Sequence, residues 1–312
     1  MTQTLTSEAK TKLAQTVRRL RGTKENPYGG LLLEGLRESV ESTYRLSLEA
    51  IVKTLVPKNS GPEKLIEKGK SLGLREEFQK KLYLLGKWLR EQIDADTTDK
   101  QFKDDTAKQT AKSQSGKRHL LEAIQLAGAT LLNRLVAIKQ LEAQGLVKPV
   151  VVTGGWQSSG YGEFREFAPD LCKDETEGYG LLLQLLFDEL ALELPGLFGK
   201  VGLTELFPVP AQTLRAEVEA LNDGALERAW TDDTTLGWVY QYWNDPQREA
   251  LDDKLNSGGK VAPHEIASKT QMFTERYMVE WLLQNSLGQQ WLAICARNGW
   301  TPDVVADGTL NR

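Results

Sequence analysis

The chain has 312 residues with a formal net charge of −4, and 40% of its residues are hydrophobic and 26% charged. This composition excludes an intrinsically disordered chain, and the length leaves room for about two domains. Two cysteines and two histidines are too few for a self-contained zinc cluster or a disulfide framework. The sequence has no apolar segment of signal-peptide length at its start and no uninterrupted membrane-spanning run, so we expect a cytoplasmic protein without membrane partners.

The first 93 residues predict a small helical bundle. Apolar residues recur at helical spacing over residues 7–22, 32–55 and 78–93, and a short helix is expected after Pro62. Clusters of glycine and proline separate these segments. Helices with one apolar face each can cover one another, so we expect residues 1–93 to form a helical N-terminal domain.

Residues 94–117 contain almost no apolar side chains and are rich in Thr, Asp, Lys and Gln. This composition is typical of a flexible linker or mobile loop and predicts a domain boundary. Helical periodicity returns in residues 118–269, which we expect to form a mainly helical scaffold domain. Its one convincing strand is residues 149–153, followed by a glycine-rich loop, residues 154–162. The predicted fold class is mainly α, with one or two short strands after the N-terminal bundle.

Charge is distributed unevenly along the chain. Residues 1–120 carry 24 Lys and Arg against 16 Asp and Glu, a balance of +8, and residues 121–312 carry 15 against 27, a balance of −12. The first third could face a polyanion such as double-stranded DNA, or it could consist of solvated helices that favour lysine. The candidate DNA-binding residues are Arg18, Arg19, Arg21, Lys80, Lys81, Lys117 and Arg118.

No pattern in the residues themselves predicts a catalytic or metal site. The glycine-rich loop lacks the Gly-Lys-Ser/Thr ending of a P-loop, so a connecting loop is favoured over a phosphate cradle. The acidic pairs Asp232-Asp233 and Asp252-Asp253 favour helix capping over metal binding. We expect His119 and His264 to be surface residues rather than general bases. The tryptophans of residues 230–243 stand at helical spacing, which favours core packing over base stacking.

Four blocks in the remainder of the sequence are more specific: residues 132–142, 186–198, 233–243 and 270–288. Their order and spacing resemble the front half of large adenine-specific DNA methyltransferases. The resemblance is strongest to the PglX-like enzymes of BREX phage-defence systems and to related DISARM and single-chain restriction–modification enzymes. It covers roughly residues 118–300, whereas the first 117 residues share only a helical and basic character with that family.

The last block implies part of a cofactor site. In that family a Phe-Thr-Pro segment opens the helix called motif X and helps to hold the methionine end of S-adenosylmethionine. The resemblance therefore implies that Phe273 and Thr274 bind this cofactor, with Glu275 standing where the family usually has proline. The same Thr274 would also suit a plain helix cap. Residues 270–312 are accordingly expected to be the incomplete start of a methyltransferase domain.

The motifs that would complete such an enzyme are absent from this sequence. The family holds its cofactor with a turn of the Asp-Pro-Ala-Cys-Gly-Ser-Gly type and grips the flipped adenine with an Asn-Pro-Pro-Tyr loop, and neither occurs here. We therefore expect this chain alone to be inactive and to bind no cofactor. Two hypotheses remain open: the N-terminal part of a methyltransferase, or a standalone non-catalytic subunit that binds DNA or assembles with other defence-system subunits.

Overall fold

The computed structural model describes residues 5–57, 61–98, 100–200, 202–270 and 272–301. The chain divides into two compact units, Met1–Lys260 and Val261–Arg312. Every regular element in the described residues is helical, so the predicted mainly α fold is confirmed.

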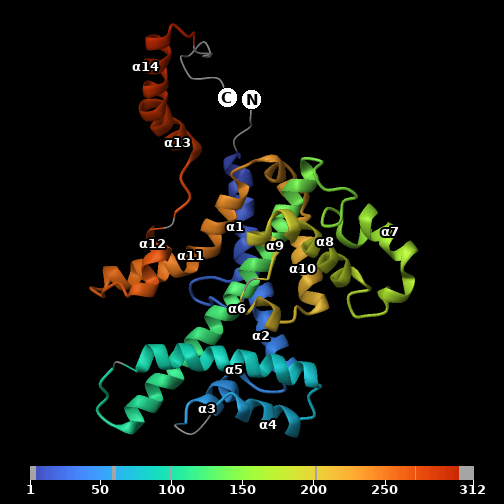
Figure 1. Ribbon diagram of the computed structural model, residues 1–312, viewed down its shortest axis with the longest axis vertical. Coiled ribbons are helices and arrows are strands. Elements are labelled where there is room, and N and C mark those ends of the chain that lie inside the picture. Colours follow the sequence, from blue (N-terminus) through green and yellow to red (C-terminus); the bar gives the residue numbers. More distant parts are fainter. Residues whose placement is uncertain (1–4, 58–60, 99, 201, 271, 302–312) are drawn as a thin grey trace. The chain divides into compact units, whose positions relative to one another are not determined.

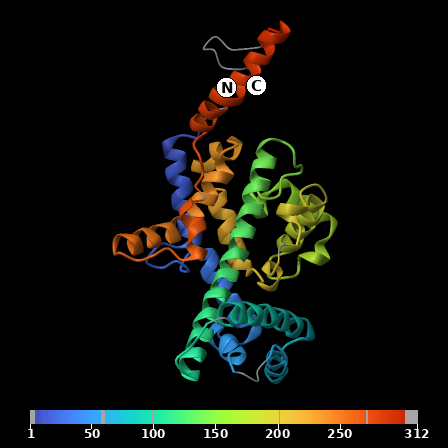
Figure 2. The same ribbon diagram turned by 60° about the vertical axis from the view of Figure 1, so that its left-hand side comes forward.

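The first unit is built around one long helix (Figures 1 and 2). This is α6, Asp105–Ala143, and the other helices of the unit's first half contact it directly or through one another. These helices are α1 (Ser7–Arg21), α2 (Leu31–Tyr44), α3 (Leu48–Leu55), α4 (Glu63–Ser71) and α5 (Glu76–Thr97). An 18-residue stretch of α6 is long and apolar enough to cross a membrane, but half of it is buried inside the unit, as in the core helix of a folded domain.

Residues 94–117 are not the flexible linker that the sequence predicts. Helix α5 continues to Thr97, and α6 begins at Asp105 with Asp104 as its N-cap, whose carboxylate accepts the N–H of Ala107 at 2.7 Å. Ala, Lys and Gln are good helix formers, so this hydrophilic sequence suits an exposed helix face. The close approach to its neighbours needs Gly116, where a Cβ would lie 2.7 Å from Val52 and 2.9 Å from Ile93.

The second half of the first unit packs against the other part of α6 (Figure 1). Its helices are α7 (Ser159–Phe167), α8 (Tyr179–Glu193), α9 (Pro195–Phe198), α10 (Ala211–Leu221) and α11 (Thr235–Asn256). Trp230, Trp238 and Trp243 are all buried, which confirms the interpretation of the tryptophans as core residues. Pro246 lies inside α11, which continues past it to Asn256.

The predicted strand at residues 149–153 is wrong. This segment is a loop whose backbone N–H groups are bonded to a side chain instead of a neighbouring strand. The buried carboxylate of Glu142 accepts the N–H of Val151 at 2.6 Å, of Val152 at 2.8 Å and of Thr153 at 2.7 Å. The glycine-rich segment that follows is also only partly a loop, because α7 begins at Ser159.

The second unit consists of short helices with little buried surface. It contains α12 (Ile266–Thr270), α13 (Arg276–Leu283), a π-helical turn (Gln284–Gly288) and α14 (Gln289–Asn298). Within its described helices, Cys295 is the one buried apolar side chain. The exposed large apolar residues of α13, the π-helical turn and α14 are Tyr277, Met278, Val279, Trp281, Leu282, Leu283, Leu287, Trp291 and Ile294. Residues 302–312 of the expected methyltransferase start lie outside the described part.

Candidate nucleic-acid interface

The seven predicted DNA-binding cations are distributed over three helices rather than one surface. Arg18, Arg19 and Arg21 lie on α1, which contacts α2, α10 and α11. The lysine pair Lys80–Lys81 lies on α5, and the pair Lys117–Arg118 on α6. Helix α5 packs against α4 and α6 at the other end of the first unit (Figures 1 and 2).

Arg21 is corrected by the structure, because its side chain is fully buried and cannot reach a phosphate. Its guanidinium carbon lies 5.4 Å from the ring centres of both Tyr28 and Trp243. Burial lowers the pKa of Arg21 to about 10, against a smaller opposing effect of Tyr28. Its neighbour Arg18 is exposed and forms an ion pair with Glu249 at 3.0 Å.

Lys80 and Lys117 are exposed and Lys81 is half-buried, and all three are paired with nearby carboxylates. Lys80 lies 3.1 Å from Glu76 and Lys81 lies 3.2 Å from Glu77, both one helical turn away. Lys117 reaches Glu49 of α3 at 3.5 Å. Exposed ion pairs contribute about 0–1 kcal/mol, so a stronger anion could replace these carboxylates.

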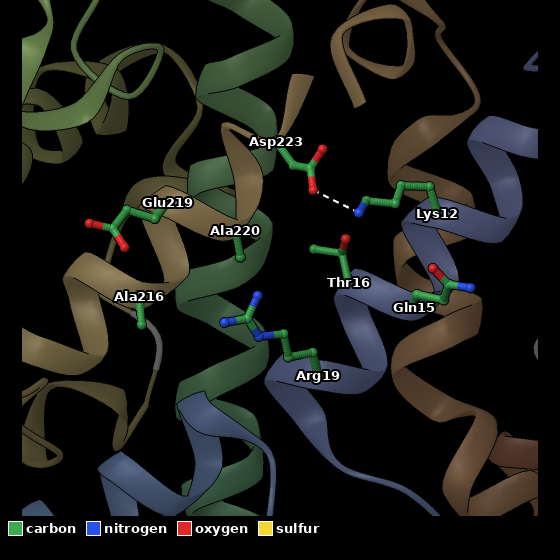
Figure 3. A pocket seen from close by; sticks show the side chains of 8 residues that line it. All are labelled: Lys12, Gln15, Thr16, Arg19, Ala216, Glu219, Ala220 and Asp223. Carbon is green, nitrogen blue, oxygen red and sulfur yellow. Dashed lines mark ion pairs between the residues drawn. The ribbon is translucent and has the colours of Figure 1, made fainter. Parts of the chain in front are cut away.

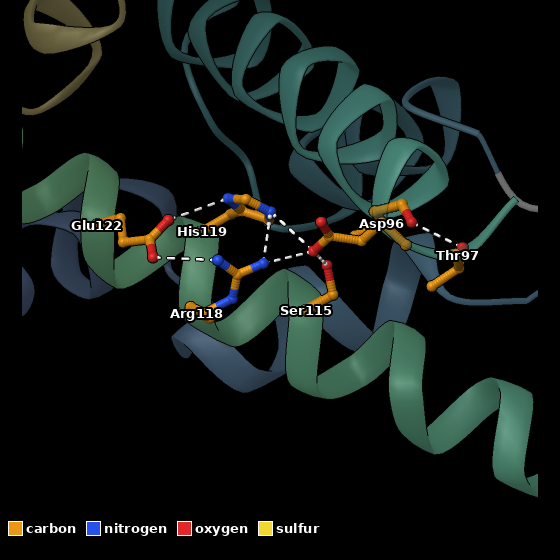
Figure 4. Close-up of polar contacts among 7 residues, drawn as sticks. Asp96, Thr97, Ser115, Arg118, His119 and Glu122 are labelled. Atoms are coloured by element: carbon orange, nitrogen blue, oxygen red, sulfur yellow. Dashed lines mark hydrogen bonds and ion pairs between the residues drawn. The ribbon is translucent and has the colours of Figure 1, made fainter. Parts of the chain in front are cut away.

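Arg118 belongs to a network that joins α5 to α6 (Figure 4). It pairs with Asp96 of α5 and, at 3.3 Å, with Glu122 one turn along α6. His119 lies between the same two carboxylates, with Nε2 3.0 Å from Asp96 and Nδ1 3.1 Å from Glu122, and Ser115 donates to Asp96 at 2.6 Å. Arg118 is therefore committed to a structural network. His119 is half-buried rather than a plain surface residue, and the side chain of His264 lies outside the described part.

The Asp96 network predicts a stability contribution that is lost in acid. Burial alone would raise the pKa of Asp96, but hydrogen bonds from Ser115 and His119 and the charge of Arg118 outweigh it, and the pKa is lowered. A lowered folded pKa stabilises the fold above the unfolded pKa near 4 and ceases to do so as pH falls through the folded value. We expect Asp96→Asn to lower the free energy of unfolding by about 1–2 kcal/mol at pH 7, with a difference that shrinks below about pH 4.

Urea unfolding at pH 7 and in acid measures this effect. Asp170→Asn is the matched control, because the Asp170 side chain is 87% exposed and its ion-pair partner among the described residues is its sequence neighbour Lys173, at 2.6 Å. Equal losses from the two substitutions at pH 7 would show that the Asp96 network carries no stability of its own.

Among the predicted cations, Arg19 lines a groove (Figure 3). The groove has a volume of about 400 Å³ and separates α1 from α10. Lys12 of α1 and Asp223, beyond the end of α10, form an ion pair across it at 2.7 Å, and Glu219 adds a second carboxylate. Two cations and two carboxylates give no net charge. This groove therefore suits a neutral or zwitterionic polar group better than a DNA phosphate.

The expected cofactor residues lie in the extended segment before α13. Phe273 is half-buried and Thr274 is exposed. The N-cap of α13 is Glu275, one residue after the expected Thr274, and it makes no side-chain capping bond. The side chain of the N-cap residue therefore does not hold the first N–H groups of α13. This helix terminus could accept a carboxylate, although Glu275 places a like charge beside it.

Sequence reasoning missed several buried charged residues, among them Lys139 and Glu217. Lys139 of α6 is buried and donates to Asn222 at 2.8 Å, and Asn222 accepts the N–H of Gly154 at 2.9 Å. This N–H is therefore not available for a phosphate in the glycine-rich loop.

Glu217 of α10 is fully buried, and neither carboxyl oxygen has a hydrogen-bond partner among the described residues. Burial raises the pKa of Glu217 well above its usual value. A charged residue at an apolar position of a helix is the only sequence signal for either.

Comparison with known proteins gives two partial relatives. The chain is 33% identical over 75 residues, 24% of its length, to the adenine-specific methyltransferase BrxX of Escherichia coli O9:H4 (strain HS). It is 34% identical over 64 residues, 20% of its length, to the adenine-specific methyltransferase PglX of Lacticaseibacillus casei (strain Zhang). Part of this chain is related to adenine-specific methyltransferases. The matched segments span only 6% and 5% of those relatives. No protein-family model and no solved structure matches the chain.

Proposed function

We propose that this chain is the N-terminal part of an S-adenosylmethionine-dependent adenine-specific DNA methyltransferase of a phage-defence or restriction–modification system. The observation that carries the proposal is the partial similarity to two adenine-specific methyltransferases from different bacteria. In the whole enzyme this chain would supply DNA contacts and a helical scaffold. The catalytic loop and most of the cofactor site would come from other parts of the polypeptide.

The second unit supports this division. Its helices expose aromatic and aliphatic side chains such as Trp281, Leu282 and Trp291, each at least 46% exposed. Short helices gain most of their stability from tertiary packing, and an apolar surface of this kind marks a place where another protein surface packs. We infer that the unit is one edge of a methyltransferase domain and that the remainder of that domain covers it.

The chain's own residues fit one end of the cofactor. The exposed hydroxyl of Thr274 and the N-terminus of α13 could bind the carboxylate of the methionine moiety. Phe273 could pack against its apolar part. S-adenosylmethionine, when bound, supplies the methyl group. For Thr274 to take part, the side chain of Glu275 must turn away from the cofactor.

Calorimetric titration with S-adenosylmethionine tests the proposal. We expect no measurable binding to the 312-residue chain and binding to the complete enzyme, because this chain supplies only one wall of the pocket. In the complete enzyme, Thr274→Val should weaken cofactor binding about tenfold through the loss of one hydrogen bond to a charged group. Thr270→Val is the control, since among the described residues the Thr270 hydroxyl donates to the carbonyl of Ile266 at 3.0 Å, within its own helix. Micromolar binding by this chain alone would contradict the division of the site.

The alternative is a standalone, non-catalytic subunit that binds DNA or assembles a defence complex. The apolar surface of the second unit favours it equally, because a separate protein could cover that surface. The reading frame distinguishes the two. A continuation into a glycine turn and an Asn-Pro-Pro-Tyr loop supports the methyltransferase, whereas a stop codon followed by an unrelated gene supports the separate subunit.

A further inference from the structure

A second groove, between α3 and α4, is positively charged. It has a volume of about 470 Å³, and its charged lining residues are Lys53 of α3 and Lys64, Glu67 and Lys68 of α4. Three cations against one carboxylate distinguish it from the neutral groove between α1 and α10. None of these lysines is among the cations that the sequence singles out.

The helices position the three lysines through their buried faces. Helix α3 buries Ile51, Val52 and Leu55, which places Lys53 on its outer side. Helix α4 is anchored by Leu65, which packs so closely on α5 that a Cβ at Gly86 would lie 2.4 Å from its Cδ1. The lysines of α4 stand one turn apart and so share one face of the helix. The groove is therefore held by the apolar contacts beneath it and does not depend on its own ion pairs.

The carboxylates around this groove leave an excess of positive charge. Lys53 forms an ion pair with Glu49 at 3.3 Å, but Glu49 also forms an ion pair with Lys117 at 3.5 Å. Lys64 pairs with Glu67 at 3.0 Å, and both side chains are more than half exposed. Lys68 is half-buried and forms no ion pair among the described residues. The local charge is therefore an excess of +2, from four lysines against two carboxylates: Lys53, Lys64, Lys68 and Lys117 against Glu49 and Glu67.

We propose that the groove between α3 and α4 binds the phosphate backbone of duplex DNA. The proposal rests on the proposed function for the identity of the polyanion. Each exposed ion pair of a lysine contributes little, so Lys53 and Lys64 can exchange a carboxylate for a phosphate. Lys68 forms no ion pair with a carboxylate among the described residues, so a phosphate there displaces none of them. Phosphate contacts by lysine position DNA without reading its sequence. Binding at this groove is therefore independent of sequence and strongly dependent on salt.

The test measures fluorescence anisotropy of a labelled duplex of arbitrary sequence with the whole chain between 50 and 200 mM salt. The triple substitution Lys53→Gln, Lys64→Gln and Lys68→Gln should reduce the magnitude of the slope of log affinity against log salt by about 2.7, or about 0.9 for each contact. The ratio of the wild-type DNA affinity to that of the triple variant should then grow about 40-fold from 200 to 50 mM salt. Replacing the same lysines with arginine should preserve the slope.

The control triple replaces Lys148, Lys173 and Lys200 with glutamine. These three lysines are exposed elsewhere in the first unit, and their substitution changes the total charge by the same amount. Circular dichroism and thermal unfolding confirm that each variant folds. If wild type binds and both triples weaken it equally, the effect is one of net charge and the groove proposal is overturned. If wild type does not bind duplex DNA at 50 mM salt, the proposed DNA contacts of this chain fail instead.

Discussion

Replacing Glu142 with alanine should lower the free energy of unfolding by about 3–5 kcal/mol. The buried carboxylate accepts three backbone N–H groups, from Val151, Val152 and Thr153, at 2.6 to 2.8 Å. Without it, the N–H groups of the two buried valines lose their partner, and each buried donor left unpaired costs about 1–3 kcal/mol. Urea unfolding at pH 7, followed by tryptophan fluorescence, measures the loss.

Two further variants make this result specific. Glu142→Gln should lose less, because its single carbonyl oxygen can still accept from both valines, although its amide group faces the N–H of Thr153. Glu219→Ala changes an exposed glutamate of α10 and should stay within about 0.5 kcal/mol of wild type. A loss of under 1 kcal/mol for Glu142→Ala would mean that water replaces the carboxylate without penalty.

Replacing Glu217 with leucine should stabilise the protein by about 1–3 kcal/mol at pH 5 and by more at pH 7. The carboxyl group is fully buried without a hydrogen-bond partner among the described residues, and burial raises its pKa well above the usual value. The folded state therefore keeps a proton that the unfolded state releases above about pH 4.5. Wild-type stability should fall with rising pH by about 1.4 kcal/mol per unit until the folded pKa is reached.

The pH dependence separates two costs at Glu217: the burial of a polar group without a partner, and the proton that the buried carboxyl group must keep. Glu217→Gln removes the titratable group but keeps a buried polar group. It should therefore abolish the contribution of Glu217 to the pH dependence of the free energy of unfolding, and it should stabilise the protein less than Glu217→Leu does. Urea unfolding of the three proteins from pH 5 to pH 8 gives both quantities. Parallel curves for wild type and Glu217→Gln would show that Glu217 is already solvated and ionised in the folded protein.

Helical periodicity predicted most of the helices but not all of their breaks. The apolar face over residues 32–55 continues through the turn that separates α2 from α3, where Arg45 adopts a left-handed conformation with φ 52° and Ser47 caps the next helix. The hydrophilic residues 94–117 resemble a linker because their partners lie on another helix. Lys112 bonds Asp94 at 3.0 Å and Ser115 bonds Asp96, and neither contact is visible as local periodicity.

The candidate DNA-binding residues could be predicted from the sequence even less well than the helices. A list of cations does not reveal that Arg21 is buried or that Arg118 is held by carboxylates of two helices, because burial and long-range pairing arise only in the folded chain. The positive charge of the first third was correctly located along the sequence. Its place on the surface depends on which carboxylates face it, as the grooves beside Lys12 and beside Lys68 demonstrate.

The length of α6 has a mechanical consequence for the first unit. A continuous helix of 39 residues spans about 58 Å. It contains no proline, and its interior glycines are clamped, since a Cβ at Gly128 would lie 2.6 Å from Leu33 and one at Gly116 would lie 2.7 Å from Val52. Neither glycine can act as a hinge. The end of the unit that carries α3 and α4 is therefore joined to the end that carries α8 and α9 by one continuous helix, in which neither a proline nor a glycine provides a hinge.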